Sequence, residues 1–273
     1  HTEVREAYRP DVQGPISLFL NLKGRSFCTT DNRKVQIPEH SFFLTNLHQE
    51  YTLEVESSSP VETFNIHIGE YLSGQALSSL RTPAETALLN GMDQPAVPFR
   101  FHNQLYRKDA VFHQIILRFR QMHEEGVDRM RFEEQMVVLL NYLVLQQREV
   151  MQQIRRLPAV KASTREELYR RLAAARDCLQ ARLQEPVTLD ELAEAACLSK
   201  FHFLRLFRQT FGLSPYQYLQ QLRLEEAKTL LRQSGIPVHQ IADRLGFENA
   251  NSFSRLFYRR ERIYPTDYRA AAN

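Results

Sequence analysis

The sequence is first informative for what it lacks. It contains no tryptophan and only three cysteines among 273 residues, and Cys28, Cys178 and Cys197 lie far apart. Without a C-x-x-C pair or a longer cysteine series, neither a disulfide framework nor a structural zinc site is expected. The three cysteines are therefore interpreted as buried free thiols in a reducing compartment.

Long apolar runs are also missing. No apolar stretch reaches the roughly 18 residues that a membrane-spanning helix needs. The first residues do not combine a basic start with an apolar middle, as a secretory signal peptide would. We therefore expect a cytoplasmic protein without a membrane partner.

Charge of one sign dominates only in the C-terminal part. Residues 1–164 carry 18 Lys and Arg against 19 Asp and Glu, a net charge of −1, whereas residues 165–273 carry 17 against 13, a net charge of +4. Fifteen of those 17 are Arg, whose planar guanidinium suits phosphates and guanine edges. This asymmetry points to nucleic acid, although a solvated basic face would look similar.

One short pattern appears twice in this basic part. The first copy spans Leu192–Tyr218 and the second Ile241–Tyr268, at an offset of 49 residues that becomes 50 beyond one extra residue in the second turn. A repeat at such a period indicates a duplicated supersecondary unit. The aligned pairs are Ala193 and Ala242, Leu198 and Phe247, Phe203 and Phe253, Arg205 and Arg255, Phe207 and Phe257, Pro215 and Pro265, and Tyr218 and Tyr268.

Each copy has the pattern of a helix-turn-helix motif. A short helix carries a small residue, Ala193 or Ala242, where a second helix must cross closely. One copy alone is explained equally well by an ordinary helical hairpin, but two copies in register, each ending in F-x(7)-P-x-x-Y, favour motifs that enter DNA grooves. After the turn, apolar residues recur at i, i+3 and i+4, namely Phe203, Leu206 and Phe207 in the first copy and Phe253, Leu256 and Phe257 in the second.

Residues 163–269, about the last 40% of the chain, resemble the paired helix-turn-helix domain of AraC/XylS-type bacterial transcription regulators. The resemblance implies a sequence-specific DNA-binding regulator that also contacts RNA polymerase. Two positions depart from the first copy, because Gly212 is replaced by Arg262 and Ser214 by Tyr264. Tyrosine is a poorer N-cap than serine, so we expect the last short helix to begin differently.

The N-terminal part has the pattern of a β-domain. From Gly14 to about Tyr71, ISLFLNLKG alternates apolar and polar residues except at Phe19, and VQI, HSFFLTNL, EYTLEVE and ETFNIHIGEY are predicted as further strands. TTDNRK at 29–34 and SSSP at 57–60 are predicted turns. Short strands at this spacing predict a sandwich or barrel, and beside the C-terminal repeat they resemble the cupin-like barrel that senses an effector. The resemblance implies that three residues contact an unidentified small molecule: His48, Tyr51 and His67.

A cupin barrel also raises the alternative of a metal-dependent enzyme fused to a DNA-binding module. Such enzymes place two histidines one residue apart on a strand, so that both side chains reach one metal. This sequence has no H-x-H pair, and His67 and Glu70 fall on opposite faces of a strand. A repair protein that transfers alkyl groups would need a zinc-bound cysteine cluster, which three isolated cysteines do not supply. No Gly-rich phosphate loop or G-x-S-x-G elbow is present, so we expect no catalytic residue, no metal and no cofactor.

Two long helical patterns follow the β-region. Asp109–Glu125 and Asp128–Leu157 each place apolar residues on one face, and Gly126 separates them. They predict an antiparallel hairpin, 109–157, for which the resemblance implies a homodimer interface, whereas packing within the chain explains it equally well. The segment 158–164 is a predicted linker because Pro158 ends the helix and no periodicity follows. A capping box at Ser163 or Thr164 would start the next helix.

The predicted fold is therefore α+β, with two domains. Residues 1–157 form a cupin-like barrel with its helical hairpin, and residues 165–273 form an all-α domain in which a linker helix joins two helix-turn-helix motifs. This linker helix begins at Ser214–Pro215 and ends near Gly235. At about 30 Å for 20 residues, it approaches the ~34 Å repeat of the major groove, so one chain is expected to read two successive major grooves of double-stranded DNA.

The residues that would face DNA follow from the buried stripes. Arg205 and Arg255 suit guanine and Asn251 suits adenine, while Phe201 and Leu204 suit thymine methyl groups. Arginines near the helix ends suit phosphates, although each arginine is also explained by a surface ion pair, for instance to Asp190 or Glu194. The predicted DNA-binding set is Lys200, Phe201, Leu204, Arg205 and Arg208 in the first copy, and Asn249, Asn251, Ser252, Ser254, Arg255 and Arg259 in the second.

Overall fold

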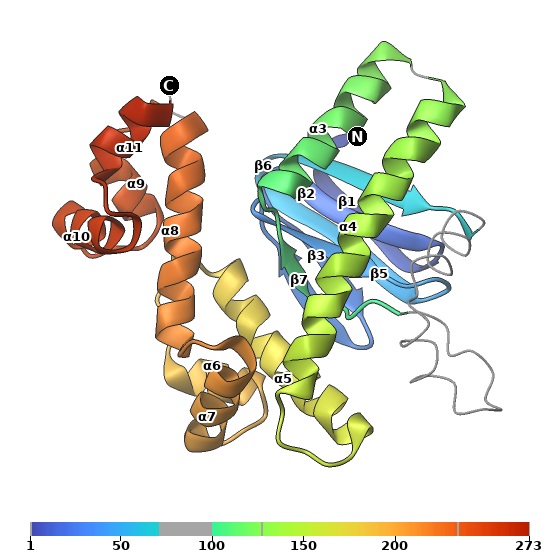
Figure 1. Ribbon diagram of the computed structural model, residues 1–273. Coiled ribbons are helices and arrows are strands. Elements are labelled where there is room, and N and C mark those ends of the chain that lie inside the picture. The colour runs from blue at the N-terminus through green and yellow to red at the C-terminus, as the bar shows by residue number, and fades with distance from the viewer. Residues whose placement is uncertain (1, 71–99, 127, 234, 273) are drawn as a thin grey trace. The chain divides into compact units, whose positions relative to one another are not determined.

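The computed structural model describes residues 2–70, 100–126, 128–233 and 235–272. The chain divides into two compact units, His1–Arg155 and Arg156–Asn273, which are described separately below (Figure 1). In the described residues, strands belong to the first unit and the second unit is helical. The predicted α+β fold is confirmed.

The first unit is built on one antiparallel sheet that curls on itself. Its strands are β1 (Thr2–Gln13), β2 (Ile16–Lys23), β3 (Ser26–Thr30), β4 (Arg33–Ile37), β5 (Ser41–Thr45), β6 (Glu50–Ile68) and β7 (Leu105–Arg107). The order is β4-β3-β6-β2-β5-β7, with β1 also paired to β6. Although β2 and β4 are not neighbours in this order, Asn21 Nδ2 on β2 donates a 2.7 Å hydrogen bond to the carbonyl of Ile37 on β4. The sheet therefore closes toward the predicted barrel.

Strand β2 is buried on both faces. Leu20 pairs with Phe42 of β5, and the Phe42 ring stacks on Phe112 of the first hairpin helix at 4.2 Å between centroids. On the opposite face, Phe19 lies inside the curled sheet, 5.1 Å from the Tyr51 ring. The departure of Phe19 from strict alternation thus reflects an apolar barrel interior.

The predicted turn at SSSP is wrong. Residues 57–60 lie within the continuous strand β6. Opposite them, the register passes from Glu6 paired with Glu56 to Val4 paired with Val61, so four residues of β6 face one residue of β1. An irregular bulge of this kind accommodates a proline that cannot donate a ladder hydrogen bond.

Three strands are absent from the sequence-based prediction. β1 is mostly exposed and carries little apolar alternation, β3 begins inside the segment before the predicted TTDNRK turn, and β7 is only three residues long. Each is defined by pairing with a partner strand rather than by its own periodicity. The end of the last predicted strand, at Tyr71, and most of the segment 72–108 lie outside the described residues.

The predicted helical hairpin is present. Helix α3 (Ala110–Glu125) begins at Asp109, whose side chain accepts from the Phe112 backbone N–H, and it ends at Gly126 in the left-handed conformation. Helix α4 (Arg129–Arg155) follows. Four residues of the predicted apolar face of α3 are buried, namely Phe112, Ile115, Ile116 and Phe119. The fifth, Val111, is 59% exposed, so the prediction is wrong at that position.

The second unit contains seven helices in the described residues. They are α5 (Ala162–Ala181), α6 (Leu189–Ala195), α7 (Lys200–Phe211), α8 (Pro215–Gln233), α9 (Val238–Arg244), α10 (Ala250–Glu261) and α11 (Pro265–Ala272). Figure 1 shows α6 and α7 near one end of α8, and α9, α10 and α11 near the other. None of the helices in the described part of the chain is long and apolar enough to cross a membrane.

Helix α5 begins earlier than predicted. Its N-cap is Lys161, which makes no side-chain cap hydrogen bond, so the predicted capping box at Ser163 or Thr164 is wrong. Both residues are exposed in the first helical turn, and the last residues of the predicted linker 158–164 are helical. Ala162, the residue type with the highest helix propensity, occupies the first helical position.

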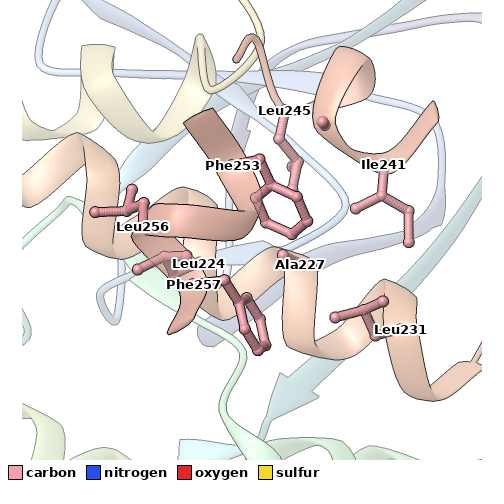
Figure 2. Packing of buried hydrophobic residues seen from close by; sticks show 9 residues of the cluster. Leu224, Ala227, Leu231, Ile241, Leu245, Phe253, Leu256 and Phe257 are labelled. Atoms are coloured by element: carbon pink, nitrogen blue, oxygen red, sulfur yellow. The ribbon is translucent and has the colours of Figure 1, made fainter. Parts of the chain in front are cut away.

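The repeated apolar stripe forms the core of each motif. In the second motif, Phe253 and Phe257 of α10 pack against Ala227 and Leu231 of α8 and against Ile241 of α9 (Figure 2). In the first motif, Phe203 and Phe207 of α7 are likewise fully buried, and the ring of Phe207 meets that of Tyr218 edge-on at 5.7 Å. The predicted buried faces are confirmed for both copies.

Two phenylalanines of α7 provide a matched test of this burial. Phe207 is 0% exposed and Phe201 is 78% exposed. We expect Phe207→Ala to lower the free energy of unfolding by about 3–5 kcal/mol, because it leaves a cavity in the core, and Phe201→Ala to change it by less than about 0.5 kcal/mol. Urea titrations followed by circular dichroism measure both. Equal losses in the two variants would contradict the assignment of the buried face.

Candidate nucleic-acid interface

The second helix of each motif, α7 or α10, is called its recognition helix. Both recognition helices, and α6 before the first of them, start at a side-chain cap. Thr188 and Glu191 form a capping box at α6, which the T-x-x-E pattern of residues 188–191 predicts. The Ser199 hydroxyl accepts from the His202 backbone N–H at the start of α7, and Asn249 Oδ1 accepts from the Ser252 N–H at 2.8 Å at the start of α10. These caps satisfy backbone donors and fix where α7 and α10 begin.

The two turns share one backbone conformation. Cys197 and Gly246, which are equivalent in the repeat, both take a positive φ, of 49° and 69°. In each motif the residue after this position donates its N–H to the carbonyl of the small residue on the first helix, from Leu198 to Ala193 at 2.9 Å and from Phe247 to Ala242 at 3.0 Å. The motifs therefore agree in local geometry up to this position, and they differ by the one extra residue that precedes the N-cap of α10.

The second motif tolerates the loss of a glycine. Arg262 follows α10 in the left-handed conformation, with φ of 61°, where Gly212 follows α7 with φ of 78°. Its N–H still donates to the carbonyl of Tyr258 at 2.9 Å. A non-glycine residue there is strained, but Pro265 occupies the first helical position of α11, as Pro215 does in α8. The expectation that the last helix begins differently is therefore wrong for its first residue. The two starts differ in their cap, because the Ser214 hydroxyl accepts from the Gln217 N–H at 3.3 Å and Tyr264 stands at the equivalent position.

The predicted DNA-facing residues lie opposite the buried stripes. Phe201, Leu204 and Arg205 are exposed on one face of α7, and Arg255 and Arg259 are exposed on α10. The full predicted set is exposed at Lys200, Phe201, Leu204, Arg205, Arg208, Asn249, Asn251, Arg255 and Arg259, and half-buried at Ser252 and Ser254.

The basic residues of this set differ in whether their charge is already neutralised by a salt bridge. Lys200 Nζ forms an ion pair with Asp190 Oδ1 at 2.5 Å, so the carboxylate proposed as an alternative partner for arginine is occupied by lysine. Within the part of the chain that the structure describes, Arg205, Arg208, Arg255 and Arg259 form no salt bridge. Four unneutralised guanidinium groups therefore stay available to an anionic partner.

A surface groove of about 610 Å³ adjoins the second recognition helix. Ser252, Arg255 and Arg259 of α10 line one side, and Tyr216 and Arg223 of α8 line the other. The sequence-based prediction missed the residues of α8, because a helical period places them on the connecting helix without indicating what they face. Tyr216 is 68% exposed.

The three predicted effector contacts do not all lie together. Tyr51 is buried, and its ring and the ring of His67 lie 5.1 and 6.2 Å from that of Phe19. His67 Nδ1 is 2.9 Å from the Ser17 hydroxyl. His48 instead occupies an exposed turn with φ of 57°, where its imidazole lies 3.5 Å from Glu70. Tyr51 and His67 thus share one environment, and His48 lies outside it.

Burial sets the protonation of this pair. Desolvation, with a smaller effect of the nearby Arg9 charge, lowers the pKa of His67 below its ordinary value. Desolvation also raises the pKa of Tyr51, against the smaller opposing effect of its hydrogen bond to Ser17. Both side chains are therefore neutral at pH 7.

The cysteines differ from the predicted uniform burial. Cys28 is buried, Cys178 is half-buried and Cys197 is exposed in the turn of the first motif. Burial raises the pKa of the Cys28 thiol to about 12. In the described residues, no three His, Cys, Asp or Glu side chains are grouped as metal ligands would be.

Comparison with known proteins finds similar sequences. The sequence model of a helix-turn-helix domain matches residues 192–271. The chain is 28% identical to the HTH-type transcriptional activator RhaS of Salmonella agona, over 95% of this chain and 94% of that protein. It is 29% identical to RhaS of Escherichia coli SE11, over 88% and 85%. A solved AraC-type regulator from Chromobacterium violaceum is 29% identical over 41% of this chain and 96% of its own, with a TM-score of 0.36.

Substitutions of Asn249 test whether its side chain caps α10. We expect Asn249→Ala to lower the free energy of unfolding by about 1 kcal/mol, because a backbone N–H of α10 loses its acceptor. Asn249→Ser keeps a capping oxygen and should stay within a few tenths of a kcal/mol. Thermal unfolding of the two variants decides this. If alanine and serine are equally stable, the side chain does not act as a cap.

Proposed function

Because the chain belongs to the AraC/XylS family of DNA-binding transcription regulators, we propose that α7 and α10 enter two successive major grooves of one duplex. The protein is a transcription regulator and not an enzyme, and the relatives named above are transcriptional activators. Arg205 and Arg255 carry this proposal, because they occupy equivalent positions of the two motifs, are exposed, and form no salt bridge with any residue that the structure describes.

The length of α8 supports reading by a single chain. Nineteen residues, Pro215–Gln233, span about 28 Å at 1.5 Å per residue. Major grooves recur on one side of B-DNA every ~34 Å. Two motifs held at opposite ends of such a helix are separated by a distance close to this repeat, so a second protomer is not needed for a bipartite site.

The exposed side chains differ in what they can recognise. Arg205 and Arg255 can donate two hydrogen bonds to the O6 and N7 atoms of guanine, and Asn251 suits the corresponding edge of adenine. Phe201 and Leu204 present apolar surface to thymine methyl groups. These residues are proposed to determine which sequence is bound.

The remaining charges suit the DNA backbone. Arg208 and Arg259 lie toward the C-terminal ends of the recognition helices, farther from the N-terminal turns that usually contact bases. Phosphate contacts position a protein without reading sequence. Lys200 is proposed to join this group after exchanging Asp190 for a phosphate.

Two arginines of α7 test this division of roles. Arg205→Ala should weaken binding to the preferred duplex by about 1–3 kcal/mol and relax specificity at one base pair. Arg208→Ala should weaken all duplexes alike and lower the salt dependence by about one counterion. Affinities are measured on duplexes selected from a random library by the intact protein, at several salt concentrations. Unchanged affinity and specificity in Arg205→Ala would refute its base-reading role.

A small-molecule effector is proposed to bind in the N-terminal unit. Tyr51 and His67, with Ser17 between them, offer neutral hydrogen-bonding groups beside the Phe19 ring. An apolar wall with a few convergent polar groups is typical of small-molecule sites. His48 is not included in this proposed site, because its side chain lies 70% exposed beside Glu70.

RNA polymerase and a second copy of this chain are proposed as further partners. An activator acts by recruiting or stimulating polymerase, and the named relatives are activators. For dimerisation through 109–157, α4 offers Val137 and Val138 at 43% and 45% exposure. Packing inside the chain accounts for the buried stripe of the hairpin, so the exposed apolar residues are the part of 109–157 that supports the proposal.

Removal of one hydroxyl tests the effector site. A compound that raises the melting temperature of the intact protein should bind Tyr51→Phe about 2–10-fold more weakly, because a single hydrogen bond is lost. His48→Ala should bind it with unchanged affinity. Isothermal titration calorimetry on the full chain measures both. Loss of binding in His48→Ala with full binding in Tyr51→Phe would exclude the proposed site.

A further inference from the structure

The middle of α8 holds an arginine that contacts both the segment preceding the first motif and the turn of the second motif. Arg223 Nε donates to the carbonyl of Leu183 at 2.8 Å, and Nη2 donates to the carbonyl of Glu185 at 3.5 Å. Both carbonyls belong to the segment that leads into the first motif. Arg223 Nη1 donates to the carbonyl of Gly246, in the turn of the second motif, at 2.9 Å. One guanidinium therefore joins two segments that are more than 60 residues apart in the sequence.

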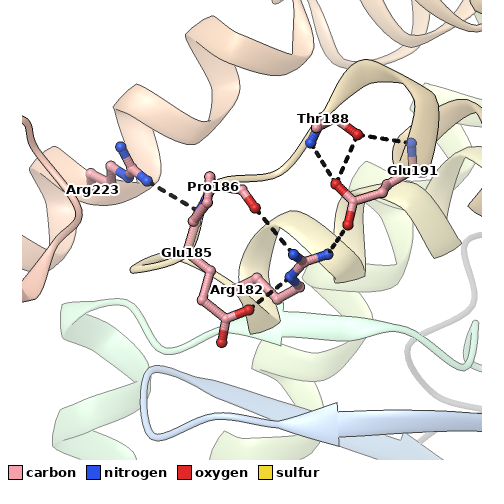
Figure 3. A network of polar contacts seen from close by, with 6 residues as sticks. All are labelled: Arg182, Glu185, Pro186, Thr188, Glu191 and Arg223. Atoms are coloured by element: carbon pink, nitrogen blue, oxygen red, sulfur yellow. Dashed lines mark hydrogen bonds and ion pairs between the residues drawn. The ribbon is translucent and has the colours of Figure 1, made fainter.

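The first of these segments is held in place by a second arginine. Arg182 contacts Glu185 Oε2 at 2.9 Å, the carbonyl of Pro186 at 3.1 Å and Glu191 Oε1 at 2.8 Å. Figure 3 shows Arg182 between these groups, with Arg223 reaching from α8 to Glu185. The backbone N–H of Thr188, with Arg182, lowers the pKa of Glu191 to about 2, so this network is charged at neutral pH. The carbonyls that accept hydrogen bonds from Arg223 thus belong to a loop that is itself held by hydrogen bonds and ion pairs.

The second segment is shaped for close approach. A Cβ atom built on Gly246 would lie 2.6 Å from the Gln184 carbonyl oxygen and 2.8 Å from Arg223 Nη2. The equivalent residue of the first motif, Cys197, has the same left-handed backbone but is exposed. The left-handed turn alone therefore does not require glycine. Glycine is required because the turn meets Gln184, in the segment preceding the first motif, and Arg223 of α8.

The contact is also anchored in the second core. The Arg223 guanidinium lies over the Phe247 ring, 5.7 Å from its centroid, and Phe247 contacts Phe253 at 5.1 Å. Phe253 is part of the core that positions α10. A displacement of the Gly246 turn relative to Leu183 would therefore be transmitted to α10.

We propose that Arg223 and Gly246 form a fixed joint between the two motifs, which sets the distance and rotation between α7 and α10 and thereby the half-site spacing that the protein accepts. Arg223 is a positioning residue in this account, and its effect on DNA rests on the proposed reading of two grooves. The geometric part of the proposal does not depend on DNA.

The dependence of DNA affinity on the spacing between half-sites is a sensitive test of such a joint. One base pair added between two half-sites moves the second by about 3.4 Å and rotates it by about 35°, a tenth of a helical turn. Two motifs connected by α8 alone could bend or twist to follow this change. Motifs locked by the joint cannot follow it without breaking hydrogen bonds to three backbone carbonyls.

The geometric part is tested without DNA. In the full chain, with Cys178 and Cys197 replaced by serine, nitroxide labels at residues 202 and 260 report the distance between α7 and α10 by double electron–electron resonance. We expect one narrow distribution for the otherwise unaltered protein, and a broader or shifted one for both Arg223→Gln and Gly246→Ala. Arg232→Gln is the matched control, since Arg232 of α8 contacts only Tyr268 of the second motif among its described ring and hydrogen-bond partners. Distributions unchanged in both variants would overturn the joint.

The functional part is tested on duplexes selected by the intact protein and on versions with one base pair inserted or removed between the half-sites. We expect the intact protein and Arg232→Gln to lose about tenfold or more in affinity on the altered spacings, and Arg223→Gln and Gly246→Ala to lose less than about threefold. A general loss of stability would weaken all spacings alike and leave their ratio unchanged, which contradicts the proposal. If the intact protein ignores spacing altogether, the two-groove function fails, while the distance measurement still decides the joint. Circular dichroism selects folded variants, and Arg223→Lys replaces Arg223→Gln if the latter does not fold.

Discussion

Burial of a repeated phenylalanine pair against the connecting helix is the constraint on which the second unit depends. Phe203 and Phe207 in one motif, and Phe253 and Phe257 in the other, are fully buried. Because the two phenylalanines of each pair are four residues apart and lie on one face of their helix, their burial fixes the rotation of the helix about its own axis. The opposite face is then left to solvent, and it carries Arg205 or Arg255. The proposed recognition of DNA thus depends first on the packing of a hydrophobic core.

The correct orientation of each recognition helix is not sufficient for binding two half-sites at once, because the two helices must also be held at a defined distance. The caps at Thr188, Ser199 and Asn249 determine where the helices start, and α8 determines how far apart the motifs lie. A single helix allows bending and twisting along its length. The contacts of Arg223 with Leu183 and Gly246 remove part of this freedom, so the second unit is held together by polar contacts as well as by its two apolar cores.

Much of this architecture is predictable from sequence, because local periodicity and an internal repeat determine it. The amphipathic helices, the stop at Gly126 and the capping box of Thr188 depend on neighbouring residues. The strand β1, the bulge at residues 57–60 and the exposed position of His48 depend instead on pairing with distant segments, which local patterns do not encode. Arg223 was missed for the same reason: its partners at Leu183 and Gly246 are brought to it only by the tertiary fold.

The central claim is that one chain contacts two consecutive major grooves on one side of the duplex. Methylation protection of guanine N7 atoms reports major-groove contacts directly, and it is carried out with the full chain at a concentration where sedimentation shows monomer. The account predicts two protected clusters whose centres lie about 10 base pairs apart, with the second cluster lost in Arg255→Ala and the first retained. A single protected cluster, or protection of two grooves only when the protein is dimeric, would contradict it.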